Sequence, residues 1–465
     1  MNINRISSRV VFGNTKNNDN DKFNDSMYED ICNFVHIPDK DVDDDANVDG
    51  SFSNVSSLDQ FEDTFKIKRS ENFDKLNMSS DKEKIIKLTT DHLLLLGKKK
   101  HFPESCEKIE IPPFVKFLSG GPGCGKSFVS KHLNGFVKHC KLGNTLCAAY
   151  MGIAAYNISG HTINSGFLIA VKKNNSAEVY TDEIHDLDPI KLDELIRKLD
   201  LNNTVILIID EISQVPPSLL FMINKRIQQA LQNDSPFGNI ATILCGDFRQ
   251  GTPIKATSIA EAVITLKRMY NDKDEYNRKQ ENPKYKESSL TRAGADLFLQ
   301  HVECIFLTVQ NRSKDPVHND LITRMSKGQS ITWNDIKYYK TMNTSDSSEF
   351  LFAPILVLTN LERIHYNHTQ IQAFAKINKS VVIRWRFPEK FCNLAKEPEK
   401  FDDPIMYEYF TICCRAYLTS NLNTYIGMAN GATVYMHSIS FIDESRRIYV
   451  EENIKNEVWS NFYIR

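Results

Sequence analysis

A glycine-rich octet lies between an apolar run and a helical pattern, and this arrangement most constrains the fold. Residues 120–127 read GGPGCGKS, which fits the spacing G-x-x-x-x-G-K-S. The run 114–118 predicts a buried strand, and the apolar spacing over 127–141 predicts a helix. Glycines let backbone N–H groups turn inward around an anion, and the positive end of the helix points at the same place. We therefore expect a strand–loop–helix unit that holds a polyphosphate; the alternative is an ordinary glycine-rich turn.

Two side chains in this segment have chemistry that suits a nucleotide bound with Mg²⁺. Lys126 carries a mobile positive charge that can reach the outer phosphates, and Ser127 offers a hydroxyl to the metal ion. We expect ATP to be held by Gly120, Gly121, Pro122, Gly123, Cys124, Gly125, Lys126, Ser127 and Phe128.

Two later strand ends add polar side chains that fit the same site. The apolar run 205–209 leads directly into Asp210 and Glu211, so Asp210 can hold the hydrated Mg²⁺ and Glu211 can polarise an attacking water. Gln250 follows the next apolar run, where it can sense the γ-phosphate or orient water. A purely structural turn is the alternative for Gln250.

Apolar runs alternate with helical patterns through the middle of the chain, which predicts an α/β fold with a parallel sheet flanked by helices. Further strands are expected at 145–150, 241–245 and 304–307, and helices at 189–198 and 218–232. After a buried strand at 355–358 and a helix through 376, a β-rich block follows, with strands at 380–385, 411–418, 432–437 and 447–450.

Charge is unevenly distributed over the 465 residues, although the formal net charge is only −2. Residues 1–63 hold 14 acidic and 5 basic residues, which leaves the remainder at about +7. A mildly basic body is compatible with a polyanionic partner and equally with an ordinary enzyme surface. Residues 1–80 contain too few apolar residues to offset chain entropy, so we expect an acidic disordered region there; a small acidic domain is the alternative.

The ten cysteines show no zinc-ligand spacing, and scattered thiols indicate a reducing, intracellular compartment. No apolar run is long enough to span a membrane. We expect a nuclear protein, with the mitochondrion as the alternative because residues 1–18 contain two arginines and no acid.

The order of five segments resembles the Pif-one-type DNA helicases of superfamily one and the helicase domains of Helitron transposons. These segments are GGPGCGKS, AAYMGIAAYNISGHTINSGF, IIDEIS, CGDFRQ and LTVQNRS. The resemblance implies a 5′→3′ DNA helicase built from a first RecA-like ATPase domain over 81–310 and a second over 311–465. It also implies ATP and Mg²⁺ as cofactors, and single-stranded DNA and duplex junctions as partners of a monomer. Repair, recombination and telomere maintenance are the processes in which such helicases act.

Transferred to matching positions, the resemblance assigns catalytic roles to Lys126, Glu211, Gln250 and Arg312, with Ser127 and Asp210 at the metal. Arg312 matches an arginine that reaches the γ-phosphate from the second domain. The segments 151–155 and 160–165 match segments that contact DNA, and their side chains can bind phosphate or sugar oxygens or stack on bases. The DNA-binding candidates are Tyr150, Gly152, His161, Thr162, Asn164 and Phe167. A role in the core or in a loop is the alternative for each.

Some positions depart from the family pattern. Met151 and Asn164 stand where the family usually has Thr and His, and 251–253 reads Gly-Thr-Pro. The family's last two motifs do not appear after Gly431, so we expect the second RecA-like domain to be incomplete, with a β-rich insertion. The alternative function is therefore a nucleotide-dependent single-strand DNA-binding protein, or an inactive helicase fragment.

Overall fold

The computed structural model describes residues 55–74, 76–169, 172–174, 177–179, 186–254, 256–271, 288–338, 352–386, 404, 407–439, 445, 448 and 462–464. The chain divides into two compact units. The larger unit comprises Val48–Tyr338 and Thr419–Ala432, and the smaller unit comprises the remaining residues. Each unit is described by itself.

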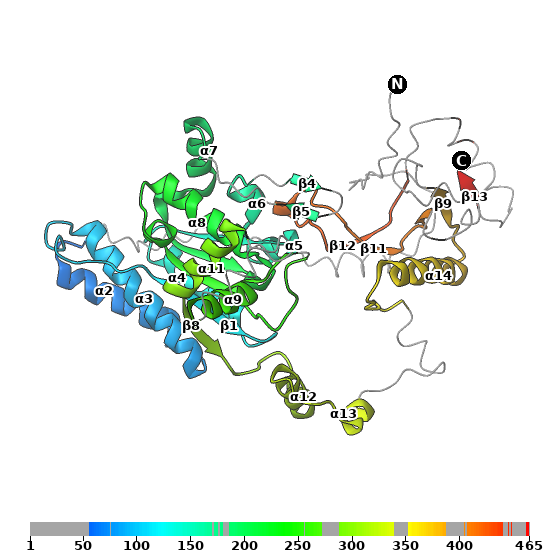
Figure 1. The fold of residues 1–465 in the computed structure, drawn as a ribbon, viewed down its shortest axis with the longest axis horizontal. Helices are drawn as coiled ribbons and strands as arrows, with labels where there is room; N and C mark the ends of the chain where they lie inside the picture. Colours follow the sequence, from blue (N-terminus) through cyan, green and yellow to red (C-terminus); the bar gives the residue numbers. More distant parts are fainter. Residues whose placement is uncertain are drawn as a thin grey trace, which may run out of the picture. The chain divides into compact units, whose positions relative to one another are not determined.

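A six-stranded sheet forms the centre of the larger unit, with strand order β3-β2-β6-β7-β1-β8 (Figure 1). Every neighbouring pair is parallel. The strands are β1 (Val115–Gly120), β2 (Asn144–Ala149), β3 (His161–Thr162), β6 (Thr204–Asp210), β7 (Ala241–Gly246) and β8 (Glu303–Leu307). The predicted α/β fold is confirmed, and the five strands predicted here agree with the structure to within two residues.

Both faces of the sheet are buried, as a parallel sheet requires. In β6, Leu207 and Ile209 belong to one hydrophobic cluster, whereas Ile206 and Ile208 belong to another. Helices α8 (Pro217–Leu231) and α11 (Ser289–His301) supply the first cluster. Helices α2 (Leu58–Phe73), α3 (Ser80–His101) and α4 (Lys126–His139) supply the second. The strongly apolar strands are therefore covered on both sides, and only their ends are available for chemistry.

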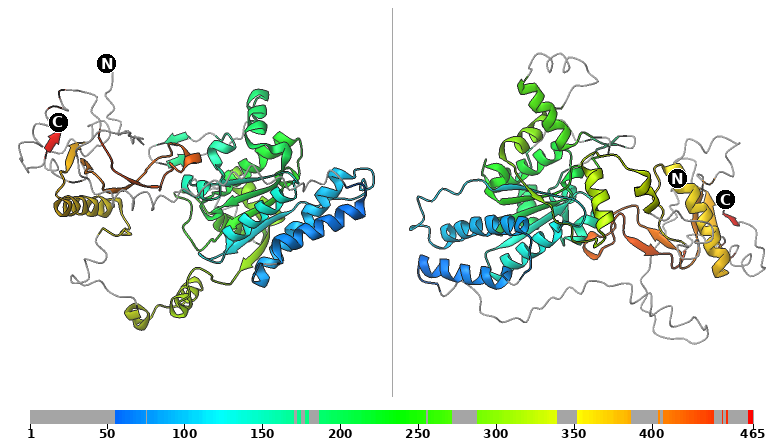
Figure 2. Two further views of the ribbon diagram at one scale, coloured as in Figure 1. Left: turned by 180° about the vertical axis from the view of Figure 1, so that it is seen from behind. Right: turned by 90° about the horizontal axis from the view of Figure 1, so that it is seen from below.

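Helices α2 and α3 lie side by side in both views of Figure 2. The predicted disordered region extended to residue 80, but the structure places α2 in the hydrophobic core. Phe61 and Phe65 are fully buried, and the Phe65 ring packs edge-on against Phe136 of α4 at 5.3 Å between centroids. The prediction of disorder rested on the acidic, weakly apolar composition of the segment and did not take into account the helical spacing of these two phenylalanines. The part of the prediction that covers residues 1–54 lies outside the described residues.

The larger unit contains several other elements. They are α5 (Gly152–Asn157), α6 (Ile163–Gly166), β4 (Lys172–Asn174), β5 (Ala177–Val179), α7 (Pro189–Leu199), α9 (Ile259–Asn271), α12 (Pro316–Ser326) and α13 (Trp333–Tyr338), with short 3₁₀ turns at Leu201–Asn203, Ile212–Gln214, Pro236–Asn239 and Thr424–Ile426. Helix α7 begins where sequence rules predict, because Asp188 caps its N-terminus and Pro189 occupies its first turn.

The smaller unit contains α14 (Asn360–Asn378) and short strands. A three-stranded sheet has the order β10 (Tyr407–Phe410), β9 (Ile383–Arg386), β13 (Phe462–Ile464), and β11 (Arg415–Tyr417) pairs with β12 (Thr433–Tyr435). The buried strand predicted at 355–358 is wrong, because these residues form no strand and Leu356 and Leu358 are each 99% exposed. The strand predicted at 447–450 lies mostly outside the described residues.

Two further expectations from the sequence concerned the cysteines and membrane-spanning segments. Within the described ranges, the eight cysteines are all free thiols. None of the described helices combines the length and the apolar character needed to cross a bilayer.

Candidate active site

The glycine-rich octet forms the turn between β1 and α4, as its residue types predict. Gly123 and Gly125 have φ angles of 85° and 95°, a region that a residue with a Cβ rarely adopts. The Lys126 ammonium donates a 2.6 Å hydrogen bond to the carbonyl of Gly120 and a longer one of 3.4 Å to Gly121. Ser127 is exposed in the first turn of α4. The loop therefore presents backbone amides, one ammonium and one hydroxyl at the positive end of a helix.

Side chains within the octet differ in their exposure. Cys124 is buried and belongs to the second hydrophobic cluster, so only its backbone is placed to serve a ligand. Phe128 is half-buried against the same cluster. The nucleotide-binding roles of these residues stay predictions.

Two carboxylates lie at the carboxyl end of β6. Glu211 adopts a left-handed conformation with φ 52°, and its N–H donates a 2.9 Å hydrogen bond to Oδ1 of Asp210. Burial raises the pKa of Asp210, although the Glu211 amide and the Lys126 charge oppose the shift. Burial also raises the pKa of Glu211, together with the negative charges of Asp210 and Asp247 and against the charge of Lys126. The lysine and the acids thus act on each other electrostatically, although β7 separates β6 from β1 in the sheet.

A third acid, Asp247, belongs to this group, and sequence reasoning missed it. It follows β7 directly and is 3% exposed. Arg249 binds its carboxylate with Nε at 2.8 Å and Nη2 at 3.2 Å. Burial alone would raise the pKa of Asp247, but the hydrogen bonds from Arg249 and the charges of Arg249 and Lys126 lower it overall. Its position directly after a buried strand could have identified Asp247 from the sequence. Only Gln250 was predicted to be a functional residue in this segment.

Gln250 lies in the turn that Asp247 organises. Its N–H donates a 2.9 Å hydrogen bond to the carbonyl of Asp247. The structure therefore fixes the backbone of Gln250 close to the acidic group, and a role in sensing the γ-phosphate stays a prediction.

The segment after β8 is tied to the glycine-rich loop. Gln310 donates from Nε2 to the carbonyl of Pro122 at 2.6 Å, and the N–H of Asn311 donates to the carbonyl of Gly123 at 2.9 Å. A Cβ added to Gly123 would lie 2.5 Å from Cβ of Arg312. Arg312 is exposed and belongs by its contacts to the larger unit, whereas the sequence-based boundary assigned it to the second domain.

Two of the residues predicted to contact DNA, Gly152 and His161, lie against the segment Thr419–Ala432, and their DNA contacts stay predictions. A Cβ on Gly152 would lie 2.1 Å from Oδ1 of Asn421. The missing side chain of Gly152 therefore leaves room for the side chain of Asn421. His161 is half-buried, and its Nδ1 lies 3.1 Å from the hydroxyl of Tyr425. Burial and the Lys198 charge lower the pKa of His161.

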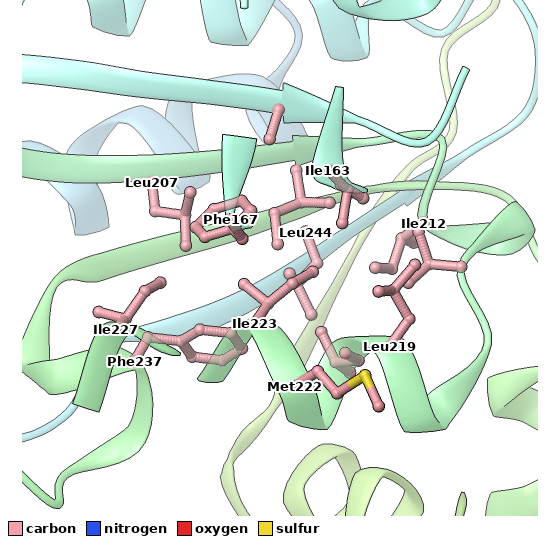
Figure 3. Packing of buried hydrophobic residues seen from close by; sticks show 14 of the residues in the cluster. Ile163, Phe167, Leu207, Ile212, Leu219, Met222, Ile223, Ile227, Phe237 and Leu244 are labelled. Carbon is pink, nitrogen blue, oxygen red and sulfur yellow. The ribbon is translucent and has the colours of Figure 1, made fainter. Parts of the chain in front are cut away.

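The prediction that Phe167 stacks on a base is wrong, because its side chain is fully buried. Figure 3 shows Phe167 with Ile163, Leu207 and Leu244 in the core beneath the sheet. Tyr150 is also partly buried against this cluster. Thr162 and Asn164 are partly exposed, so of the six candidates these two and His161 keep accessible side-chain surface near α6 without belonging to the core.

No group of three or more His, Cys, Asp or Glu in the described part of the chain is placed to hold a metal ion by protein ligands alone. The donor set nevertheless fits Mg²⁺, which usually binds one or two carboxylates and retains waters and substrate phosphate oxygens as its other ligands. Asp210 and Ser127 would be its protein ligands. Burial raises the pKa of both Asp210 and Glu211, so a cation bound beside them would stabilise their charged forms.

Part of the chain is similar to known proteins. Residues 108–274 match the model of the PIF1-like helicase family. The ATP-dependent DNA helicase Pif1 of Psychrobacter sp. (strain PRwf-1) is 34% identical over 141 residues, which cover 30% of this chain and 20% of that protein. The PIF1 helicase of Saccharomyces cerevisiae (strain YJM789) is 30% identical over 139 residues, or 30% of this chain and 15% of the relative. The matched region thus spans a fifth or less of these relatives.

Solved structures of Pif1 helicases are similar over more of the chain. A complex of two coordinating Pif1 helicases at forked DNA has a TM-score of 0.47 at 19% identity and covers 79% of this chain and 72% of that one. The Bacteroides Pif1 complex with ADP-AlF3 and single-stranded DNA has a TM-score of 0.45 at 20% identity and covers 79% and 71%. The glycine-rich loop and both strand-end acids Asp210 and Asp247 lie inside residues 108–274, the part of the chain that matches the PIF1-like helicase family model.

Proposed function

We propose that this chain couples ATP hydrolysis to 5′→3′ movement along single-stranded DNA and to separation of duplex strands. The observation that carries the proposal is the electrostatic group of Lys126, Asp210, Glu211 and Asp247 around a glycine-rich loop at the start of a helix. This combination of one mobile cation, acids at strand ends and inward-facing amides is the chemistry of phosphoryl transfer to water.

Each residue has a defined part in the proposed reaction. Lys126 would release its contact with the carbonyl of Gly120 and bind the outer phosphates. Glu211, with its raised pKa, would orient the attacking water and accept its proton. Asp210 and Ser127 would hold the Mg²⁺ that accompanies ATP, which would supply positive charge to the phosphates. Gln250 would sense the γ-phosphate, and Arg312 would stabilise the charge that develops on it.

The proposed DNA contacts follow from partly exposed polar residues in and just before α6. Thr162, Asn164 and His161 can bind sugar or phosphate oxygens, which positions a strand without reading its sequence. Single-stranded DNA and duplex junctions are therefore the proposed partners. An intracellular role in DNA repair or recombination belongs to the same proposal.

The first test measures ATP hydrolysis with and without single-stranded DNA. Lys126→Ala and Glu211→Gln should each lower DNA-stimulated turnover by roughly a hundredfold or more. Lys131→Ala is the matched control, because Lys131 is an exposed lysine on the same helix, and it should keep wild-type turnover. Wild-type turnover in Lys126→Ala would contradict the assignment of the site.

Strand displacement tests the coupling of hydrolysis to movement. A duplex with a 5′ single-stranded tail should be separated in the presence of ATP, and a duplex with a 3′ tail should not. Hydrolysis without displacement of either duplex would favour the alternative, a nucleotide-dependent single-strand binding protein.

A further inference from the structure

A buried lysine on α3 points at the glycine-rich loop. Lys82 is the third residue of α3 and is 7% exposed, so most of its side chain is out of water. Among the described residues, no hydrogen bond or ion pair from its ammonium is formed, and only the Phe128 ring lies under it, 5.4 Å from Nζ to the ring centroid. Lysine is almost never buried without a partner, so this side chain requires an explanation.

The ammonium of Lys82 lies against the start of α4. A Cβ built on Gly125, the residue that precedes α4, would lie 2.7 Å from Cε and 3.0 Å from Nζ of Lys82. The absence of a side chain at Gly125 is therefore what admits the lysine. The same glycine has a φ of 95°, so one residue both shapes the loop and opens the space for the ammonium.

The nearest acid along the chain is already occupied. The carboxylate of Asp81 accepts a 2.7 Å hydrogen bond from the N–H of Thr308 and a 2.9 Å bond from the backbone N–H of Lys82, and it also contacts the Ser79 hydroxyl. These bonds orient Asp81 toward β8 and the end of its own helix. They leave the ammonium of Lys82 without a carboxylate among the described residues.

Three positive features thus lie along the same short loop. They are the Lys82 ammonium beside Gly125, the Lys126 ammonium at the carbonyl of Gly120, and the N-terminal end of the α4 dipole. A partly dehydrated ammonium beside other positive charge is unfavourable unless an anion pairs with it. The anion that the adjacent loop would bind is the phosphate chain of a nucleotide.

We propose that Lys82 is a second nucleotide-binding cation, which pairs with the phosphate chain of the nucleotide held by the loop. The inference rests on the proposed function, because it requires that the loop bind ATP. Lys82 is a binding and positioning residue here, and Lys126 keeps the catalytic role.

Titration with a fluorescent ATP analogue tests the proposal in the full-length chain. Lys82→Met retains much of the side chain's length without its charge and should weaken binding by roughly tenfold or more, whereas Lys82→Arg should retain much of the wild-type affinity. Lys87→Met is the matched control, because Lys87 is exposed on the same helix, and it should bind as the wild type does. ADP should show the same order of affinities.

Thermal unfolding separates a binding role from a structural one. Without nucleotide, Lys82→Met should unfold at the same temperature as the wild type or higher, because the variant removes a charge on a largely buried side chain that has no hydrogen-bond or ion-pair partner among the described residues. With saturating ATP, its midpoint should rise by less than that of the wild type. Equal ATP affinity of the Lys82→Met and wild-type chains would overturn the inference.

The other outcomes are also decisive. If Lys82→Met weakened binding of single-stranded DNA and left ATP affinity unchanged, the anion would be DNA and the inference would be wrong. If the wild type bound ATP and Lys126→Ala did not, while Lys82→Met bound normally, the proposed function would stand without the second cation. Absence of ATP binding by the wild type would reject both.

Discussion

The N–H of Asn311 donates a 2.9 Å hydrogen bond to the carbonyl of Gly123. This bond joins the segment after the last strand of the sheet to the middle of the glycine-rich loop. Gln310 adds a second bond to the neighbouring carbonyl of Pro122. The conformation of the loop therefore depends on residues almost 190 positions away in the chain.

Gly123→Ala should disrupt this attachment. The new Cβ would lie 2.0 Å from Oε1 of Gln310, and the φ of 85° is unfavourable for alanine. We expect a loss of about 1–3 kcal/mol in the free energy of unfolding, with weaker ATP binding. Gly135→Ala is the control, because Gly135 lies inside α4 with open space around it, and it should stabilise the protein by about 0.5–1 kcal/mol. Equal effects of the two substitutions in urea denaturation would contradict this account.

Arg249→Met should destabilise the larger unit by leaving Asp247 buried without its bidentate partner. We expect a loss of about 1–3 kcal/mol at pH 7, because half of the Arg249 side chain is exposed and screened by water. The pKa of Asp247 is lower in the folded chain than the ordinary value of 3.8. Its stabilising contribution is therefore complete above that value and is lost as pH falls through the folded pKa. Denaturation at pH 7 and pH 3 should show the difference between variant and wild type shrinking in acid.

His92 should make the protein sensitive to mild acid. Burial and the Lys116 charge lower the pKa of His92 from 6.5 to about 4, and its Nε2 is buried without a hydrogen bond in the described structure. The folded state binds fewer protons than the unfolded state between these values, so stability falls as pH decreases from 6.5 to 4, by at most roughly 3 kcal/mol. His92→Phe should remove this part of the pH dependence. Parallel stability curves for the two proteins would show that His92 does not contribute.

Phe65→Ala should destabilise the protein by about 3–5 kcal/mol, because it removes a fully buried ring from the contact between α2 and α4. Ile67→Ala, two residues later on the same helix, changes a side chain that is 60% exposed and should alter stability by no more than about 0.5 kcal/mol. Thermal unfolding compares them directly. Similar small effects would mean that α2 does not belong to the folded body.

Much of the sheet and the loop could be predicted because local sequence specifies them. The run Val205–Ile209 has the continuous apolar character of a strand covered on both faces, and β6 matches it closely. The glycines, Lys126 and Ser127 occupy a motif whose spacing determines its own geometry. The position of Asp210 and Glu211 at the end of this strand was predictable for the same reason, and their roles stay predictions.

The incorrect predictions depended on tertiary contacts that short segments do not encode. Phe167 has the chemistry of a base-stacking residue, but it lies four residues after Ile163 and packs into the same core cluster. Leu356 and Leu358 are apolar, but they are exposed and belong to none of the sheets formed by the described residues. The contact of Gln310 with Pro122 could not be foreseen, because it joins distant segments that carry no sequence pattern in common.

The order of the strands has a consequence for how the protein is made. Among the described strands, β1, which carries the glycine-rich loop, pairs with β7 and β8, and these begin at Ala241 and Glu303. During synthesis one edge of β1 remains open until β7 has left the ribosome and the other until β8 has left it, and exposed apolar edges of this kind invite aggregation. A nascent chain that stalls before Glu303 therefore holds its glycine-rich loop on a strand that still lacks one native neighbour.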